Sequence, residues 1–325
     1  MTLWTLRELA FHERLFAPIC FLRKIPPFSP SISTDRLNSL HFMRWTPGGL
    51  SSDVEDRRGD GGGGGFGGGG LGIVGFLILL VISLVTGRNY IGAYFSSGGA
   101  THTQQSAPRP ASPQEDRSAQ LASFVLGDVQ DTWTQILARD NIRYPRAHLV
   151  LFRDYTRSGC GAAQSATGPF YCPADQKVYL DLGFWDELKR FGASGDFAQA
   201  YVIAHEIGHH VQNVIGIERK VRAMQAQNPQ ARNRLSVAME LQADCFAGVW
   251  AHSSTDRQIT DQADIKTGLQ AAAAVGDDRL QRMGRGYVTP DTFTHGSSEQ
   301  RMSWFNRGFT TGKVGACNTF AGSGP

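Results

Sequence analysis

Three residues, His205, Glu206 and His209, form an H-E-x-x-H pattern inside an apolar run of the sequence. On a helix, side chains four residues apart lie on the same face, so both imidazoles can reach one metal ion. Glu206 directly follows the first histidine, where its carboxylate can accept a proton from a water molecule that the metal activates. The pattern predicts zinc-dependent hydrolysis of peptide bonds. The alternative is a surface helix with a solvated His-Glu-His edge.

An acidic pair follows downstream, at Glu240 and Asp244, in a run of apolar and small residues. A catalytic zinc takes three protein ligands and leaves a fourth position for water, and Glu240 is a suitable third ligand. Because Asp244 shares a helix face with Glu240, we expect its carboxylate to accept the other ring N–H of a ligand histidine. The alternative is that both carboxylates form the solvated edge of an alanine-rich helix.

Two further histidines lie near these motifs. His210 is next to a predicted ligand but points about 100° away on a helix, so we interpret it as structural or as a partner of the site. His252 lies about two turns past Asp244 and is a rival for the third-ligand position. Metzincins carry a glycine and a third histidine where this chain has Gln212 and Ile215, which excludes that class.

Stretches outside these two motifs also match one known family. They are residues 43–45, 53–59, 158–161, 168–173, 178–182, 240–248 and 294–301. On these stretches the chain resembles the putative neutral zinc metallopeptidases, which are bacterial, membrane-anchored zincins with a glutamate as third zinc ligand. The resemblance implies a zincin-like metallopeptidase domain with bound Zn²⁺, a single membrane anchor, and a peptide or protein as substrate.

The resemblance also points to His295. In related zincins a histidine downstream of the glutamate ligand donates a hydrogen bond to the oxyanion that forms during attack. Residues 294–296 are predicted to form a loop in front of a helix, which suits that role. The alternative is a histidine that only orders its loop. We expect Arg301 to orient His295 or Glu240.

One apolar stretch, residues 71–86, approaches the length of about 20 residues that a membrane-spanning helix needs. A glycine run before it and a polar run after it argue against a buried core helix, and we favour an uncleaved anchor over a signal peptide. The sequence is predicted to divide into an N-terminal extension that is non-native or disordered (1–42), a short cytoplasmic and Gly-rich segment (43–70), a transmembrane helix (71–86), a flexible linker (87–118) and the zinc metallopeptidase domain (119–325).

The cysteines indicate the compartment. One of the five, Cys20, precedes the apolar stretch, and the others follow it. Two disulfide pairs are candidates, Cys160 with Cys172 and Cys245 with Cys317, and they suit an oxidising compartment. Buried free thiols, a second metal site, or a cytosol-facing protease with reduced cysteines are the alternatives. Together with the resemblance, this predicts a single-pass protein of the inner membrane with its catalytic domain on the periplasmic side.

The remaining alternative concerns function. A net charge of +3 is too small to favour nucleic acid as a partner. The rival to a peptidase is a non-catalytic, zinc-containing binding or scaffold domain tethered to the membrane. A structural zinc needs no general base and is usually closed by a fourth protein ligand, so Glu206 favours the peptidase.

The spacing of apolar residues predicts a helix-rich α+β fold with a small sheet. Strands are expected at 148–152 and 177–182, with a sheet edge within 168–181 that pairs with an extended substrate. Helices are expected at 120–138, 184–190, 197–215, 217–226, 237–252, 261–275 and 301–310. The active site is then expected between the helix of His205 and the helix of Glu240.

Overall fold

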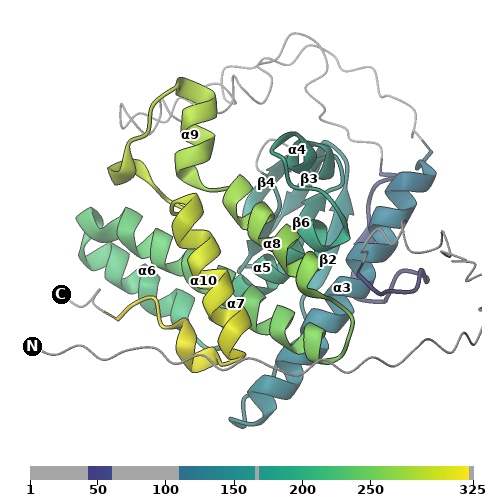
Figure 1. The fold of residues 1–325 in the computed structure, drawn as a ribbon, viewed down its shortest axis with the longest axis horizontal. Helices are drawn as coiled ribbons and strands as arrows, with labels where there is room; N and C mark the ends of the chain where they lie inside the picture. The colour runs from purple at the N-terminus through teal and green to yellow at the C-terminus, as the bar shows by residue number, and fades with distance from the viewer. Residues whose placement is uncertain (1–42, 61–109, 165–167, 322–325) are drawn as a thin grey trace, which may run out of the picture. The chain divides into compact units, whose positions relative to one another are not determined.

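The described part of the chain, residues 43–60, 110–164 and 168–321 of a computed structural model, is a helix-rich α+β fold (Figure 1). Its main sheet has the order β1-β2-β6-β5. β1, β2 and β6 run parallel, and β5 pairs antiparallel with β6. These strands are β1 (Val54–Asp56), β2 (His148–Phe152), β5 (Phe170–Cys172) and β6 (Lys177–Asp181). A separate hairpin comprises β3 (Tyr155–Ser158) and β4 (Gly161–Gln164).

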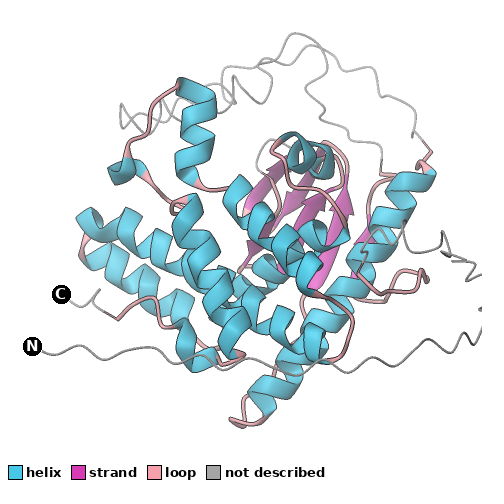
Figure 2. Ribbon diagram, viewed as in Figure 1, coloured by secondary structure: helices cyan, strands magenta, loops and turns pink. Residues whose placement is uncertain are grey.

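Helices make up most of the rest (cyan in Figure 2). They are α3 (Pro113–Ala138), α4 (Phe184–Arg190), α5 (Asp196–Val214), α6 (Ile217–Gln227), α7 (Arg232–Asp256), α8 (Gln262–Ala274), α9 (Asp277–Arg285) and α10 (Ser298–Thr311). Short 3₁₀ turns are η3 (Pro229–Ala231), η4 (Pro290–Thr292) and η5 (Val314–Cys317). The predicted helix-rich α+β class with a small sheet is confirmed, whereas the zincin-like arrangement stays a prediction.

The helix α5 lies in the core and carries the H-E-x-x-H motif. Nearly every side chain from Asp196 to Gln212 is buried, as expected for a helix that is packed on all sides. It contacts α3, α7, α8 and β5. At its first turn the Asp196 carboxylate accepts hydrogen bonds from Trp45 and Arg117, a favourable place for a negative charge. The alternative of a solvated surface helix is therefore wrong.

Glycines allow α7 to approach two neighbouring helices closely. A Cβ atom on Gly208 of α5 would lie 3.0 Å from the carbonyl oxygen of Ala243 on α7. A Cβ atom on Gly248 of α7 would clash with the carbonyl oxygen of Phe305, and one on Gly308 of α10 would clash with a carbonyl of α7. These contacts leave no room for larger residues, so they hold α7 close against α5 on one side and against α10 on another; α7 and α10 can be followed in Figure 1.

Both predicted disulfides are present. Cys160 and Cys172 are joined with their Cα atoms 5.8 Å apart, and Cys245 and Cys317 with theirs 5.6 Å apart. The second bridge ties η5 near the C-terminus to α7. The alternatives of free thiols and a second metal site at these cysteines are therefore wrong.

Several boundaries differ from the prediction. The helix α3 begins at Pro113 rather than at residue 120, so the last part of the predicted linker 87–118 is helical. Ser112 caps this helix by accepting from the Glu115 N–H, while the Glu115 side chain accepts from the Ser112 N–H. The Ser-x-x-Glu pattern is a sequence signature of a helix start, so this boundary could have been predicted. The helix α9 and the β3–β4 hairpin were not predicted.

Residues 43–60 belong to the same folded unit as residues 110–321, whereas the cytoplasmic location of the segment 43–70 stays a prediction. The strand β1 pairs with β2, Met43 is buried in the core, and the Arg44 N–H donates to the carbonyl of Ile259. The residues on the two sides of the 61–109 stretch therefore contribute strands to one sheet.

The predicted transmembrane helix 71–86 itself lies outside the described residues, as does the predicted extension 1–42. In the described ranges, none of the helices has the length and apolar character that crossing a membrane requires.

Candidate metal centre

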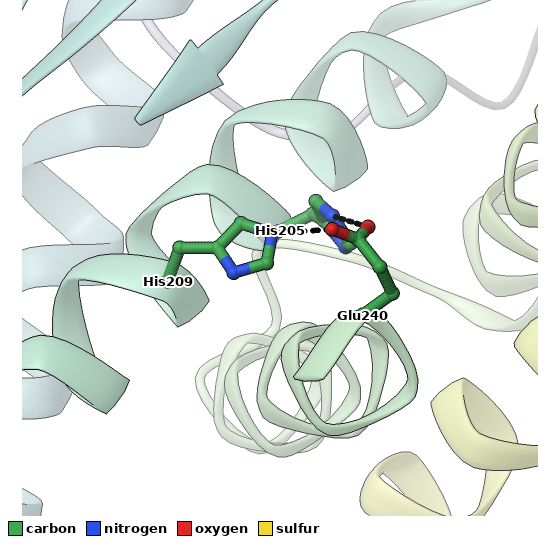
Figure 3. A group of neighbouring side chains, drawn as sticks. All are labelled: His205, His209 and Glu240. Carbon is green, nitrogen blue, oxygen red and sulfur yellow. Dashed lines mark ion pairs between the residues drawn. The ribbon is translucent and has the colours of Figure 1, made fainter. Parts of the chain in front are cut away.

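The three predicted ligands converge, His205 and His209 from α5 and Glu240 from α7 (Figure 3). Nε2 of His205 lies 3.2 Å from Glu240 Oε2, and Nε2 of His209 lies 3.4 Å from Glu240 Oε1. A tetrahedral zinc with bonds of about 2.0–2.1 Å holds neighbouring ligand atoms about 3.3 Å apart, which is close to these two distances, and the ligand atoms of all three residues lie within 4.8 Å of one another. Whether these side chains bind zinc stays a prediction.

The charges around this group favour a cation. Burial lowers the pKa of His205, but the charge of Asp244 and hydrogen bonds to Asp244 and Glu240 outweigh burial and raise the pKa to about 10. Burial also lowers the pKa of His209, and Glu240 again outweighs it and raises the pKa. Burial raises the pKa of Glu240, but the two histidines hold it well below its usual range. A metal ion would occupy the place of these protons.

The surroundings of His205 are charged and fully buried. Its Nδ1 lies 2.9 Å from Asp244 Oδ1. Arg301 of α10 donates to both oxygens of that carboxylate, at 2.8 and 2.9 Å, and the Tyr201 hydroxyl donates to Oδ1 at 2.5 Å. Arg301 therefore orients Asp244, rather than His295 or Glu240 as predicted. An acceptor at Nδ1 fixes the tautomer that leaves Nε2 free for a metal.

The surroundings of His209 contain no ion pair other than that with Glu240 among the described residues. Its Nδ1 lies 2.9 Å from the amide oxygen of Gln212, which is one turn further along α5 and completely buried. Gln212 in turn donates to Gln242 and to the carbonyl of Met239, both on α7. The two predicted ligand histidines are thus held by different kinds of group.

Glu206 is 7% exposed and lies next to the ligand group on α5. Its charge acts on His209, where it works to raise the pKa of the imidazole. The side chains of His209 and Glu240 are each 18% exposed, so the group is reached by solvent from this side. A carboxylate that is close enough to His209 to act on its pKa is a candidate to take a proton from water at this group. Its role as general base stays a prediction.

His295 approaches the same group from the loop between η4 and α10. Asp277 holds this loop: its Oδ2 accepts the N–H groups of Thr294, His295 and Gly296, and its Oδ1 lies 3.2 Å from His295 Nδ1. Partial desolvation by neighbouring groups lowers the pKa of His295, but the hydrogen bond to Asp277 and the charge of Glu240 outweigh it and raise the pKa. The side chain is 53% exposed, so it is accessible to a substrate. Its role also stays a prediction.

His210 and His252 lie away from the predicted ligands. His210 is completely buried, with Nδ1 2.9 Å from the Tyr171 hydroxyl on β5 and Nε2 2.7 Å from the Pro145 carbonyl. It joins α5 to the sheet, in agreement with the structural interpretation. Nδ1 of His252 lies 2.7 Å from the carbonyl of Phe309 on α10, so His252 faces α10 and does not compete with Glu240.

Sequence comparison identifies the family. A model of the putative neutral zinc metallopeptidases matches residues 43–320, and the chain belongs to this family. The uncharacterized protein YpfJ of Escherichia coli (strain K12) is 50% identical over 286 residues, which are 86% of this chain and all of that protein. The uncharacterized proteins Mb2605 of Mycobacterium bovis and Rv2575 of Mycobacterium tuberculosis (strain H37Rv) are each 46% identical over 191 residues, 55% of this chain and 64% of each relative. No solved structure matches the chain.

Four residues of the centre were missed in the sequence: Tyr201, Gln212, Gln242 and Asp277. Gln212 and Gln242 are polar residues within apolar helical runs, which is a signal that each has a buried partner. Tyr201 lies four residues before His205 and so shares its helix face, although this spacing is equally typical of a core aromatic residue. We find no sequence signal that connects Asp277 with His295.

Proposed function

We propose that this protein is a zinc-dependent peptidase that hydrolyses peptide bonds with Glu206 as general base. The observation that carries the proposal is the convergence of His205, His209 and Glu240, with Glu206 directly after His205 on α5. Among the described residues no fourth His, Cys, Asp or Glu completes the group. A structural zinc is usually closed by four protein ligands, so this arrangement favours a catalytic site over a binding or scaffold domain.

Zinc, when bound, would polarise the scissile carbonyl and make the attacking water more acidic. The chain's own residues would then handle the protons and the charge. Glu206 would accept the proton of the attacking water and donate it to the amine that leaves. His295, whose raised pKa favours the protonated form, would donate a hydrogen bond to the carbonyl oxygen as negative charge develops there. Asp277 would orient His295 for that contact.

The substrate would lie along the edge of the main sheet. The strand β5 is an edge strand, paired on one side only with β6 among the described residues, and it contacts α5. Its other side has no strand partner among the described residues and would offer backbone N–H and carbonyl groups to an extended peptide. Within the predicted range 168–181, β5 is therefore the strand that we propose as the substrate edge, because β6 is paired on both sides.

The test compares the full-length wild-type protein with Glu206→Gln in zinc content and in casein cleavage. We expect about one zinc per chain in both and cleavage only by the wild type, because the amide cannot accept a proton. Glu299→Gln, on the exposed first turn of α10, is the matched control and should cleave like the wild type. Zinc in all three proteins with cleavage in none would favour the binding or scaffold domain. Cleavage by Glu206→Gln would rule out Glu206 as general base.

We also propose that the folded unit lies outside the cytoplasm and contacts the inner membrane through residues 71–86. The two disulfides support an oxidising compartment. Because β1 belongs to the same sheet as β2, the proposal includes residues 43–60.

This location is tested by labelling whole cells with a membrane-impermeant maleimide. Single cysteines would be introduced at two exposed positions, Ser52→Cys and Ala111→Cys, after Cys20→Ser. We expect both sites to be labelled. Labelling of the second site alone would indicate a single crossing between them, and labelling of neither would place the protein in the cytoplasm.

A further inference from the structure

A chain of hydrogen bonds leads from His209 to the C-terminal disulfide. His209 Nδ1 lies 2.9 Å from the Gln212 amide oxygen, and Gln212 Nε2 lies 3.1 Å from the Gln242 amide oxygen. Gln242 Nε2 lies 2.9 Å from the carbonyl oxygen of Cys317, which is bonded to Cys245 of α7. Gln212 is completely buried and Gln242 is 4% exposed, so water does not compete for these groups.

The carbonyl of Cys317 determines which group donates and which accepts in each of these hydrogen bonds. The Cys317 carbonyl can only accept, so the NH₂ group of Gln242 must face it and the Gln242 oxygen must face Gln212. Gln212 therefore presents its NH₂ group, which also donates to the carbonyl of Met239 at 2.8 Å. The reverse orientation of Gln212 would place its oxygen against two acceptors. The Gln212 oxygen consequently faces His209.

The orientation of Gln212 decides the tautomer of His209. Opposite an oxygen that only accepts, Nδ1 must carry the hydrogen, and the lone pair of a neutral imidazole is then on Nε2. Nε2 is the atom that faces Glu240. An imidazole without that acceptor is free to carry its hydrogen on Nε2, where it would block a metal.

We propose that Gln212 and Gln242 are positioning residues that fix His209 as a metal ligand, with the Cys317 carbonyl as their anchor. The inference rests on the proposed zinc site and adds the residues that prepare its second histidine. The Cys245–Cys317 bridge takes part because it holds the anchor against α7, the helix that also carries Glu240 and Gln242. The segment η5 thereby helps to position a metal ligand that it does not contact.

The test measures zinc affinity of the full-length protein by competition with a chromogenic chelator, for wild type, Gln212→Leu and the control Gln199→Leu. Gln199 is a buried glutamine of the same helix whose amide oxygen has no hydrogen-bond partner in the described structure. We expect Gln212→Leu to bind zinc about 10–100-fold more weakly, as for other groups that orient metal ligands, and the control to bind like the wild type. Circular dichroism establishes that each variant is folded.

A spectroscopic measurement separates positioning from a general loss of packing. In zinc-loaded protein labelled with ¹⁵N-histidine, the Nδ1–H signal of His209 should be protected from exchange in the wild type and in Gln199→Leu. It should exchange rapidly in Gln212→Leu. If that variant does not fold, Gln242→Leu replaces it, and we expect a few-fold loss of affinity with faster exchange.

The outcomes are distinguishable. Wild-type affinity and a protected Nδ1–H signal in the folded Gln212→Leu or Gln242→Leu variant would overturn the inference and leave the zinc site intact. A wild-type protein that binds no zinc would overturn the proposed function together with the inference. Weaker binding with a lost signal in the variant, and neither change in the control, would support both.

Discussion

The two histidines of the H-E-x-x-H motif are held by different chemistry. His205 faces a buried ion pair between Asp244 and Arg301, which the Tyr201 hydroxyl completes. His209 faces a neutral pair of amides, Gln212 and Gln242, which ends at a backbone carbonyl. Both arrangements place an acceptor at Nδ1 and leave Nε2 toward Glu240.

The difference lies in what each arrangement costs and what it controls. A buried ion pair is expensive to desolvate and damaging to break, since the remaining charge has no water around it. A buried amide pair carries no net charge, so its loss costs only the desolvation of polar groups. We therefore expect the His205 side to dominate stability and proton binding, and the His209 side to act mainly through orientation.

The largest effect on stability is expected for the ion pair of Asp244 and Arg301 beside His205. Arg301→Met removes the guanidinium that donates to both oxygens of the buried Asp244 carboxylate, which we expect to lower the free energy of unfolding by about 3–5 kcal/mol. Gln212→Leu should lower it by about 1–3 kcal/mol. Urea unfolding of the metal-free proteins measures both, with the exposed Arg307→Met on the same helix as control. Equal losses for Arg301→Met and Gln212→Leu would remove the distinction between the two sides.

The next effect concerns the disulfide behind the neutral side. Replacing Cys245 and Cys317 together by alanine should lower the free energy of unfolding by about 2–4 kcal/mol, because the bridge closes a long loop. Zinc affinity should also fall, because the Cys317 carbonyl loses its fixed position. The control is replacement of Cys160 and Cys172, whose bridge closes a short loop away from the amide pair and should leave zinc affinity unchanged. If the replacement of Cys245 and Cys317 lowers stability but leaves zinc affinity unchanged, the bridge stabilises the fold and does not help to position His209.

How much of this contrast could be predicted from the sequence depends on the range of each interaction. The ligands His205, His209 and Glu240 and the partner Asp244 lie in helices, where spacing alone places side chains on one face. The amide pair depends instead on how α5 packs against α7 and on where η5 ends, and no local pattern describes that packing. Asp277 and His295 likewise meet only because α9 and the following loop fold back.

The sheet gives a second example. The strands β2 and β6 were predicted because apolar and β-branched residues dominate them. The strand β1 is only three residues long, Val54–Asp56, and carries two acids, so its composition does not indicate a strand. Its place is determined by pairing with β2, a partner far along the chain. Short strands at sheet edges are therefore where prediction from this sequence fails.

The pH dependence of zinc binding distinguishes the two sides in another way. Without metal, the pKa of His205 is raised to about 10 by Asp244 and Glu240 against the opposing effect of burial. Zinc must displace that proton, so below this pKa the affinity should rise with pH, by about tenfold per unit for each proton released. Asp244→Asn removes a negative charge and lowers the pKa, so the rise should end at lower pH.

Gln212→Leu should keep the pH dependence of the wild type while its affinity is lower throughout, because the amide contributes no charge. Isothermal titration calorimetry in buffers of different ionisation enthalpy counts the protons released at each pH. Two results would contradict the division between charge and orientation. One is that zinc binding to Gln212→Leu releases fewer protons than binding to the wild type. The other is that binding to Asp244→Asn at pH 8–9 releases as many protons as binding to the wild type.

The smallest effect tests whether the neutral side acts as one unit. Gln242→Leu leaves Gln212 with the Met239 carbonyl as its remaining orienting partner, so we expect zinc affinity to fall only a few-fold, by less than about 1 kcal/mol. If the amides act in series, the double variant with Gln212→Leu should bind zinc no more weakly than Gln212→Leu alone, because the distant amide then has nothing left to orient. Neighbours in one network are typically non-additive in this way, whereas independent sites add. Additive losses in the double-mutant cycle would mean that Gln242 acts on the metal centre through packing of α7, and the contrast between the two histidines would then be one of charge alone.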